Sequence, residues 1–246
     1  MRMIKKFLLL FVGLPIILFG MTCAYSEQEI SRSLKIILTV EKNTYVFGEP
    51  VKLLITALNI DSKPIQVSLC KDVYTICISS GKEFEEYRYS QEEEKISPAW
   101  KTLNPGEKIE ICQTILFRIQ QENNFLMKDY TFKREGFYTI KVIYKMGNNI
   151  ERESNSVKIE VRVPKGGDSL VWEKIKSPEF AEFLQLGYVL EKAKESEVIK
   201  TLKQIIEKYP ASTYTPYIKE ALIKYYRTKP DKIPEEKEYL KTLQKD

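Results

Sequence analysis

The chain has 246 residues, no histidine and four cysteines, and its formal charge is +5. Arg2, Lys5 and Lys6 account for three of its 39 basic residues, so 36 basic residues face 34 acidic ones beyond this start. Such a balance lacks the basic surface that nucleic-acid binding requires. The absence of histidine excludes the usual Ser-His-Asp and Cys-His nucleophile systems and histidine-containing zinc sites. We therefore expect a non-catalytic protein without a metal or cofactor and with no nucleic-acid partner.

Residues 1–26 have the layout of an export signal. A positive start is followed by the apolar run Phe7–Phe19, which is shorter than the roughly 20 residues of a membrane span. Small residues then favour cleavage by signal peptidase after Ala24 or Ser26. We expect a mature protein outside the cytoplasm, either periplasmic or secreted.

Cys23 offers a second outcome for this leader. Gly20-Met21-Thr22-Cys23 is similar to a bacterial lipobox in placing a cysteine after a hydrophobic run, although Gly20 and Thr22 replace the usual Leu and Gly or Ala. If Cys23 is lipidated, the protein is a membrane-anchored lipoprotein. We expect membrane attachment only in that case.

Between residues 27 and 164, apolar residues recur at every second position in short runs. This period predicts half-buried strands, because successive side chains of a strand point to opposite faces. The runs are 34–40, 51–57, 65–69, 109–119, 138–144 and 157–163. Turn residues such as Gly48-Glu49-Pro50 and Asn104-Pro105-Gly106 separate them. We therefore predict an all-β antiparallel sandwich.

From residue 165 to 246 the apolar period becomes helical, which predicts a second, α-helical domain. Ser177-Pro178-Glu179 combines a capping residue, a proline at the first helical position and an acid in the first turn. Asp168 can cap a short helix before it, and Pro234 opens a last one. The short connections favour antiparallel helical hairpins.

The segment Tyr45–Val163 resembles a bacterial immunoglobulin-like sandwich of the intracellular proteinase-inhibitor type. The resemblance is carried by residues 45–51, 59–65, 103–107 and 136–140. It implies a tyrosine corner, in which the hydroxyl of Tyr138 bonds back to the preceding chain. The antibody pattern is not met, because Ile140 stands where the second bridging cysteine would be.

The tail resembles tetratricopeptide-type helical hairpins. Leu186-Gly187-Tyr188 and residues 206–214, with Pro210, are similar to the repeat's motifs. Pro178 and Pro210 are 32 positions apart, close to the roughly 34-residue repeat. Two units are fewer than the about three that stand alone, so we expect the tail to lean on the sandwich or on a partner.

Six aromatic residues are candidate binding residues. A long aromatic loop at 81–100 suits contact with a partner, and the concave face of helical hairpins can hold an extended peptide; core packing is the alternative for both. The candidates are Phe84, Tyr87, Tyr89, Trp100, Tyr214 and Tyr217.

The cysteines give one candidate bridge. Cys70 and Cys77 can form a disulfide in an oxidising compartment, with free thiols as the alternative. Cys112 is out of phase with Ile109 and Ile111 and is either a buried small residue or a third thiol, burial being the commoner case.

These features predict an exported non-catalytic protein-binding or assembly module of the bacterial cell envelope, whose partner is an envelope protein or peptide. A first alternative is a proteinase inhibitor that acts through an exposed sandwich loop. A second is a carboxylate-based hydrolase that uses the acidic cluster of the 81–100 loop, made of Glu83, Glu85, Glu86, Glu92, Glu93 and Glu94.

Overall fold

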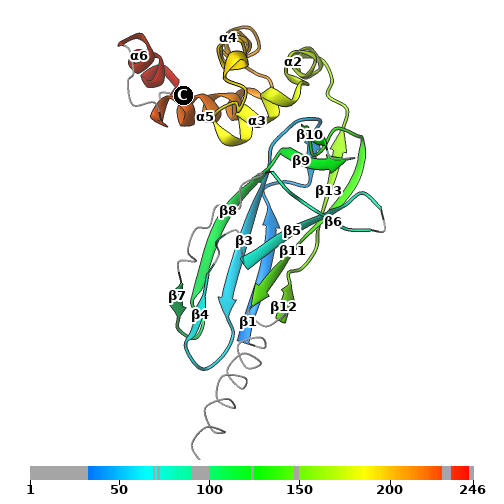
Figure 1. Cartoon of the computed structure of the whole chain (residues 1–246), viewed down its shortest axis with the longest axis vertical. Helices are drawn as coiled ribbons and strands as arrows, with labels where there is room; N and C mark the ends of the chain where they lie inside the picture. Colours follow the sequence, from blue (N-terminus) through cyan, green and yellow to red (C-terminus); the bar gives the residue numbers. More distant parts are fainter. Residues whose placement is uncertain are drawn as a thin grey trace, which may run out of the picture.

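The computed structural model describes residues 33–68, 70, 73–81, 83–89, 100–122, 125–146, 150–228 and 234–243. The predicted leader with Cys23 and the cluster Glu92–Glu94 lie outside these residues. Within them the chain is mostly antiparallel β-structure followed by a C-terminal helical region. Figure 1 shows the helices gathered at one end of the strands.

Two sheets form the β part. The first has the order β1-β3-β8, made of β1 (Leu34–Val40), β3 (Val51–Asn59) and β8 (Lys108–Ile115). The second has the order β2-β13-β11-β5-β6, made of β2 (Thr44–Val46), β13 (Val157–Arg162), β11 (Gly136–Met146), β5 (Tyr74–Ser79) and β6 (Glu85–Glu86), with β12 (Ile150–Glu153) on β11. Among the strands that the structure describes, only the β13–β2 pair is parallel.

Two small hairpin-like pairs complete the β part. β4 (Ile65–Val67) pairs with β7 (Lys101–Leu103), and β9 (Phe117–Glu122) pairs with β10 (Phe125–Tyr130). The strands predicted from the period are present, but β2, β5, β6, β7, β10 and β12 were not predicted. These are short or carry no clear alternation of apolar and polar residues.

The two sheets pack on one shared core. On the first sheet, Leu38, Leu53 and Ile55 are fully buried, and on the second Ile140 and Ile159 meet them. Each such side chain contributes about 1.5–3 kcal/mol by leaving water. The period-two pattern therefore marked the core faces correctly.

The predicted long strand 109–119 is wrong in one respect, because it breaks at Leu116. Ile115, Leu116 and Phe117 are consecutive and all fully buried, which a continuous half-buried strand does not allow. The N–H groups of Leu116 and Phe117 donate to the side chain of Gln185 rather than to a neighbouring strand. The chain leaves the sandwich core here and enters a second core.

Five helices follow among the described residues. They are α2 (Gly167–Ile175), α3 (Pro178–Leu186), α4 (Lys192–Lys208), α5 (Thr215–Thr228) and α6 (Pro234–Leu243). Ser177 is the N-cap residue of α3 and Pro178 its first residue, as predicted. The helix ends at Gly187, whose φ of 80° is left-handed. None of the described helices combines the length and apolarity needed to cross a bilayer.

The helices share their core with strands. Phe117, Ile119 and Tyr130 of the β9–β10 hairpin are buried together with Phe183 and Leu222 of α3 and α5. The expectation that the tail leans on the sandwich is confirmed. The helical region is a cap built onto one end of the β part.

Polar contacts fix this cap to the β part. Tyr214 donates its hydroxyl hydrogen to the carbonyl oxygen of Phe47 (2.6 Å), and Tyr217 donates to Glu49 (2.9 Å). Glu49 is only 1% exposed and also accepts from Val46 N–H and pairs with Lys42. A buried carboxylate needs such partners, so the contacts stabilise one arrangement of the two parts.

The tyrosine corner expected at Tyr138 is present. Its hydroxyl donates to the carbonyl oxygen of Arg134 at 3.0 Å. This bond ties the start of β11 to the preceding turn.

Gly48 lies at the closest approach of the two parts. Its φ is 66°, and a Cβ atom there would lie 2.1 Å from Cζ3 of Trp172 on α2. Gly106 has a similar φ of 78°, but a Cβ there would meet nothing within 4 Å. A substitution at Gly106 therefore tests backbone strain alone, whereas one at Gly48 adds a steric clash with Trp172.

We predict that Gly48→Ala lowers the free energy of unfolding by about 3 kcal/mol or more, because it adds a clash with Trp172 to the strain. Gly106→Ala, the matched control, should lose about 1 kcal/mol from strain alone. Urea denaturation of both variants measures the difference. Equal losses would show that Trp172 does not pack on Gly48.

Candidate functional site

A groove of about 390 Å³ lies between the β5–β6 edge and the β9–β10 hairpin. Its lining includes the rings of Tyr87, Tyr130 and Tyr138, of which Tyr130 and Tyr138 are buried. Met127 also lines it and is 51% exposed. The groove therefore joins a partly aromatic lining to an accessible apolar side chain.

The rim of this groove carries charges of both signs. Arg118 pairs with Glu85 at 3.1 Å, and Lys133 pairs with Asp129. Exposed pairs like these are worth at most about 1 kcal/mol, so a partner can exchange them at small cost.

Thr131 lies in the same lining. It is 7% exposed, and its N–H donates to the carbonyl oxygen of Leu116 at 2.7 Å. Its Oγ1 is buried without a hydrogen-bond partner among the described residues. Buried polar atoms normally have partners, so this hydroxyl is one unsatisfied group beside the groove.

The predicted binding residue Tyr87 is used inside the molecule. Its hydroxyl lies 2.8 Å from the carbonyl oxygen of Phe117 and 3.0 Å from Oε1 of Gln185, and burial raises its pKa. Its ring stacks on Tyr89, with centroids 5.7 Å apart. Tyr87 therefore fixes the groove wall to the helical cap.

The other predicted aromatic residues fall into two groups. Tyr214 is 1% exposed and Tyr217 bonds to Glu49, so both serve the junction rather than an open peptide-binding face. For Tyr214, whose ring is buried in the core, this is the packing that was the alternative to binding. Phe84 and Trp100 are exposed by 40% and 57% and stay available for contact.

The predicted Cys70–Cys77 bridge is not formed, since Cys70, Cys77 and Cys112 are all free thiols. Cys70 packs against the sandwich core, as does Ile76. Cys77 follows Ile76 in β5 and so points to the opposite face of the sheet. Two cysteines whose side chains diverge in this way cannot be bridged without moving the backbone.

Cys112 is exposed on β8, which corrects the expectation that it is buried. It lies opposite Leu54 on the outer face of the first sheet. Among the described residues, no group of three or more acidic or cysteine side chains is placed to hold a metal ion.

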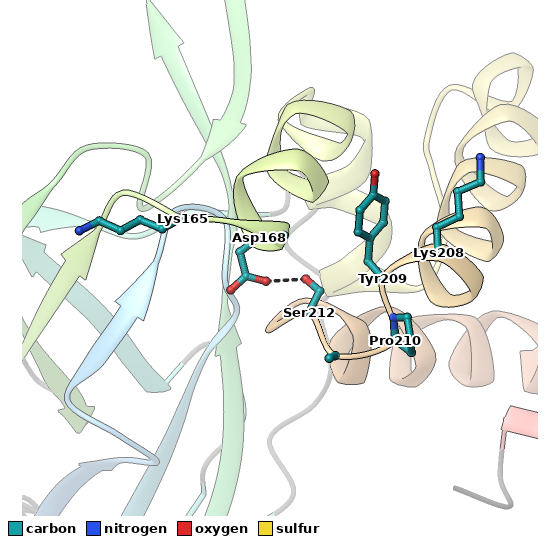
Figure 2. Close-up of a pocket in the computed structure, with 8 residues that line it drawn as sticks. Lys165, Asp168, Lys208, Tyr209, Pro210 and Ser212 are labelled. Atoms are coloured by element: carbon teal, nitrogen blue, oxygen red, sulfur yellow. Dashed lines mark hydrogen bonds between the residues drawn. The ribbon is translucent and has the colours of Figure 1, made fainter.

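A second recess, of about 370 Å³, lies where α2 begins beside the α4–α5 turn. Asp168 accepts hydrogen bonds there from the Ser212 hydroxyl (2.6 Å), the Thr213 hydroxyl (2.6 Å) and the Thr213 N–H (2.8 Å). Figure 2 shows the amino groups of Lys165 and Lys208 pointing away from this carboxylate. The hydrogen bonds of Asp168 in this recess therefore hold the start of α2 to the α4–α5 turn.

Gln185 was not identified from the sequence, although it organises the junction. It is 8% exposed, and its Oε1 accepts from Leu116 N–H (2.8 Å) and Phe117 N–H (2.7 Å) as well as lying near Tyr87. Its Nε2 has no partner among the described residues. The only signal was one amide between Leu184 and Leu186 in an apolar helix.

Comparison with known proteins gives weak likenesses. No family model matches the chain, and neither does any curated protein. A CARDB domain from Pyrococcus furiosus is 11% identical, with a TM-score of 0.30 over 53% of this chain and 94% of that one. The sporulation control protein Spo0M from Bacillus subtilis is 13% identical, with a TM-score of 0.34 over 58% and 54%.

A β-glucosidase from Listeria innocua is 12% identical, with a TM-score of 0.31 over 52% of this chain but only 16% of the enzyme. Identities and TM-scores this low carry no argument about function. The functional argument therefore depends on this chain's own residues.

We predict that Gln185→Ala lowers the free energy of unfolding by about 3 kcal/mol, because two buried N–H groups lose their acceptor. In acid, where its carboxyl group is neutral, Gln185→Glu keeps the acceptor oxygen without burying a charge, so it should lose less there. Thermal and urea denaturation of both variants test this. A Glu variant as unstable in acid as the Ala variant would show that the acceptor is not what matters.

We also predict that Asp168 contributes to the free energy of unfolding and that this contribution is lost in acid. Burial alone would raise its pKa, but the bonds from Ser212 and Thr213 lower it below the usual value of 3.8. A lowered folded-state pKa stabilises the protein above the unfolded-state value and is lost as pH falls through the folded-state value. Asp168→Asn should therefore be less stable at neutral pH, and its deficit should shrink below about pH 4. A deficit that is constant with pH would contradict this.

Proposed function

We propose that the chain is an exported, non-catalytic protein-binding module of the bacterial cell envelope. The observation that carries the proposal is the groove between the β5–β6 edge and the β9–β10 hairpin. It combines a tyrosine-containing lining, the exposed Met127 and a rim of both charges. Tyrosine, methionine and arginine are enriched at protein-binding surfaces, and Tyr87, Met127 and Arg118 line this groove.

The groove is also held in shape, which favours recognition of a partner without rearrangement. Tyr87 joins one wall to Gln185 of the cap, and Tyr130 donates its hydroxyl to the carbonyl oxygen of Ile175 on α2. Walls that are fixed before binding reduce the ordering cost of association. The export pattern of residues 1–26 supports an envelope location for such a module, and the proposed partner is an envelope protein or peptide.

At the level of the fold, the proposal is an immunoglobulin-like sandwich with a tetratricopeptide-like helical cap. The strand orders β1-β3-β8 and β2-β13-β11-β5-β6 support the first part, together with the bond from Tyr138 to Arg134. The α4–α5 hairpin, which turns at Pro210, supports the second. The proteinase-inhibitor alternative and the hydrolase using Glu92–Glu94 stay predictions.

To test the groove, a photo-crosslinking amino acid replaces Met127 in the full-length protein expressed in its native cells. The matched control position is Leu170 on α2, which is similarly exposed at 55% but lies outside the groove. We expect covalent adducts with one or a few envelope proteins from position 127 and none of these from position 170. Arg118→Glu, which reverses a rim charge, should reduce the adducts several-fold.

Adducts that are identical at both positions would contradict the proposal, because contact would then not depend on the groove. Absence of any adduct at position 127 while the protein is correctly exported would also contradict it. Retention of the protein in the cytoplasm would overturn its envelope location.

A further inference from the structure

The outer edge of β8 has backbone groups that no described strand pairs with. In the first sheet β3 is central, and β8 is one of the two edges. The N–H of Asn59 donates to the carbonyl oxygen of Glu107. These two residues form the pair that would follow Leu58 and Lys108 in the β3–β8 register. Since bonding alternates along an antiparallel pair, the odd-numbered residues of β8 face β3. Lys108, Glu110, Cys112 and Thr114 therefore direct their N–H and C=O groups outward.

The opposite edge of the sheet confirms this alternation. The N–H of Ile60 donates to the carbonyl oxygen of Ser33, so the backbone groups of even-numbered residues of β3 point toward β1. The backbone N–H and C=O of Leu38 in β1 therefore point away from β3, although its side chain is buried. The side chain of Asn155 meets both groups of Leu38, accepting from its N–H (2.9 Å) and donating to its C=O (2.8 Å). At that edge, one side-chain amide therefore occupies both outward groups of Leu38.

The far end of β8 is closed in a similar way. The next outward-facing residue, Leu116, donates its N–H to Gln185 and accepts from Thr131 N–H at its C=O. Within β8, Nε2 of Gln113 donates to the carbonyl oxygen of Thr114 (3.1 Å), which is one of these outward groups. The open stretch among the described residues thus runs from Lys108 to Thr114.

We propose that this stretch pairs with the same stretch of a second copy, antiparallel about a two-fold axis. The axis passes between Ile111 of one copy and Ile111 of the other. Lys108 then lies opposite Thr114, and Glu110 opposite Cys112. The pairing joins the two sheets into one with the order β1-β3-β8-β8-β3-β1.

This register is selected by bonding and by charge. It uses the outward groups of all four residues on both copies, whereas a shift of two residues in either direction leaves one residue of each copy unpaired. A shift that places Glu110 opposite Glu110 also opposes like charges, which destabilises a strand pair. The two-fold arrangement is self-complementary, as a homodimer interface must be.

The side-chain pattern of β8 also fits its own copy. Ile109 and Ile111 are only partly buried and pack on the sandwich core at the open edge. An added strand therefore needs apolar residues at alternate positions, and β8 has them. Residues 90–99 of the chain, Ser-Gln-Glu-Glu-Glu-Lys-Ile-Ser-Pro-Ala, lack this alternation and include a proline.

The pairing is tested by a crosslink that can form only between two copies. A variant with Glu110→Cys and Cys112→Ser is mixed with the native mature protein under mild oxidation. In the proposed register, position 110 faces Cys112 of the other copy at a Cα separation of about 5.5 Å, within disulfide range. The matched control carries Lys35→Cys and Cys112→Ser, because Lys35 is exposed on β1. We expect the disulfide to form at least tenfold faster at position 110.

A second pair of variants tests the backbone bonds. Cys112→Pro removes an N–H that points only outward, so it should leave the β3–β8 pairing intact while abolishing the dimer. Cys112→Ala keeps this N–H and should remain dimeric. Sedimentation velocity over a wide concentration range measures the oligomeric state, and circular dichroism verifies the fold.

Equal crosslinking at positions 110 and 35 would overturn the proposal. So would a native protein that stays monomeric at every concentration. If such a monomer also protected the amides of residues 108, 110, 112 and 114 from hydrogen exchange, the chain's own residues would be the occupant of the edge.

Discussion

The structure depends on how the chain leaves the first sheet at Leu116. Two consecutive backbone N–H groups are buried there, and both donate to the single oxygen Oε1 of Gln185. Without this acceptor, each group would be buried unpaired, at a cost of about 1–3 kcal/mol. The bond links the end of β8 to α3, and through Tyr87 to the groove wall. One amide thus positions the sandwich, the cap and the groove relative to one another.

This dependence explains why the helical region is not a free-standing repeat. Phe117 and Tyr130 supply a buried surface that a third repeat would otherwise have to provide. Hydrogen bonds are directional, and those from Tyr214 to Phe47 and from Tyr217 to Glu49 fix how the helices are oriented on this buried surface. Apolar burial gives the junction its stability, and these hydrogen bonds select one orientation of the cap.

The sequence predicted what local patterns encode and missed what tertiary partners decide. The predictions of β1, β3 and β13 from alternation and of the α3 start from Ser177-Pro178 were correct, because each pattern depends only on residues close together in the sequence. The break at Leu116 was missed because its cause, Gln185, is 69 positions away. For Tyr214 and Tyr217 the sequence left both packing and binding open, because the same aromatic residue suits a core and a binding surface. The Cys70–Cys77 bridge was wrong because spacing does not show that Cys70 packs on the sandwich core while Cys77 points to the other face of β5.

The bonds from the Asn155 side chain to Leu38 on the edge of β1 bear on the number of copies that can assemble. A sheet with two free edges can add copies without limit and grow into a fibre. Here Asn155 of the same molecule already occupies both outward groups of Leu38, in the middle of the β1 edge. A further strand could not bond to Leu38 without displacing this amide, so one side chain disfavours growth beyond the second copy.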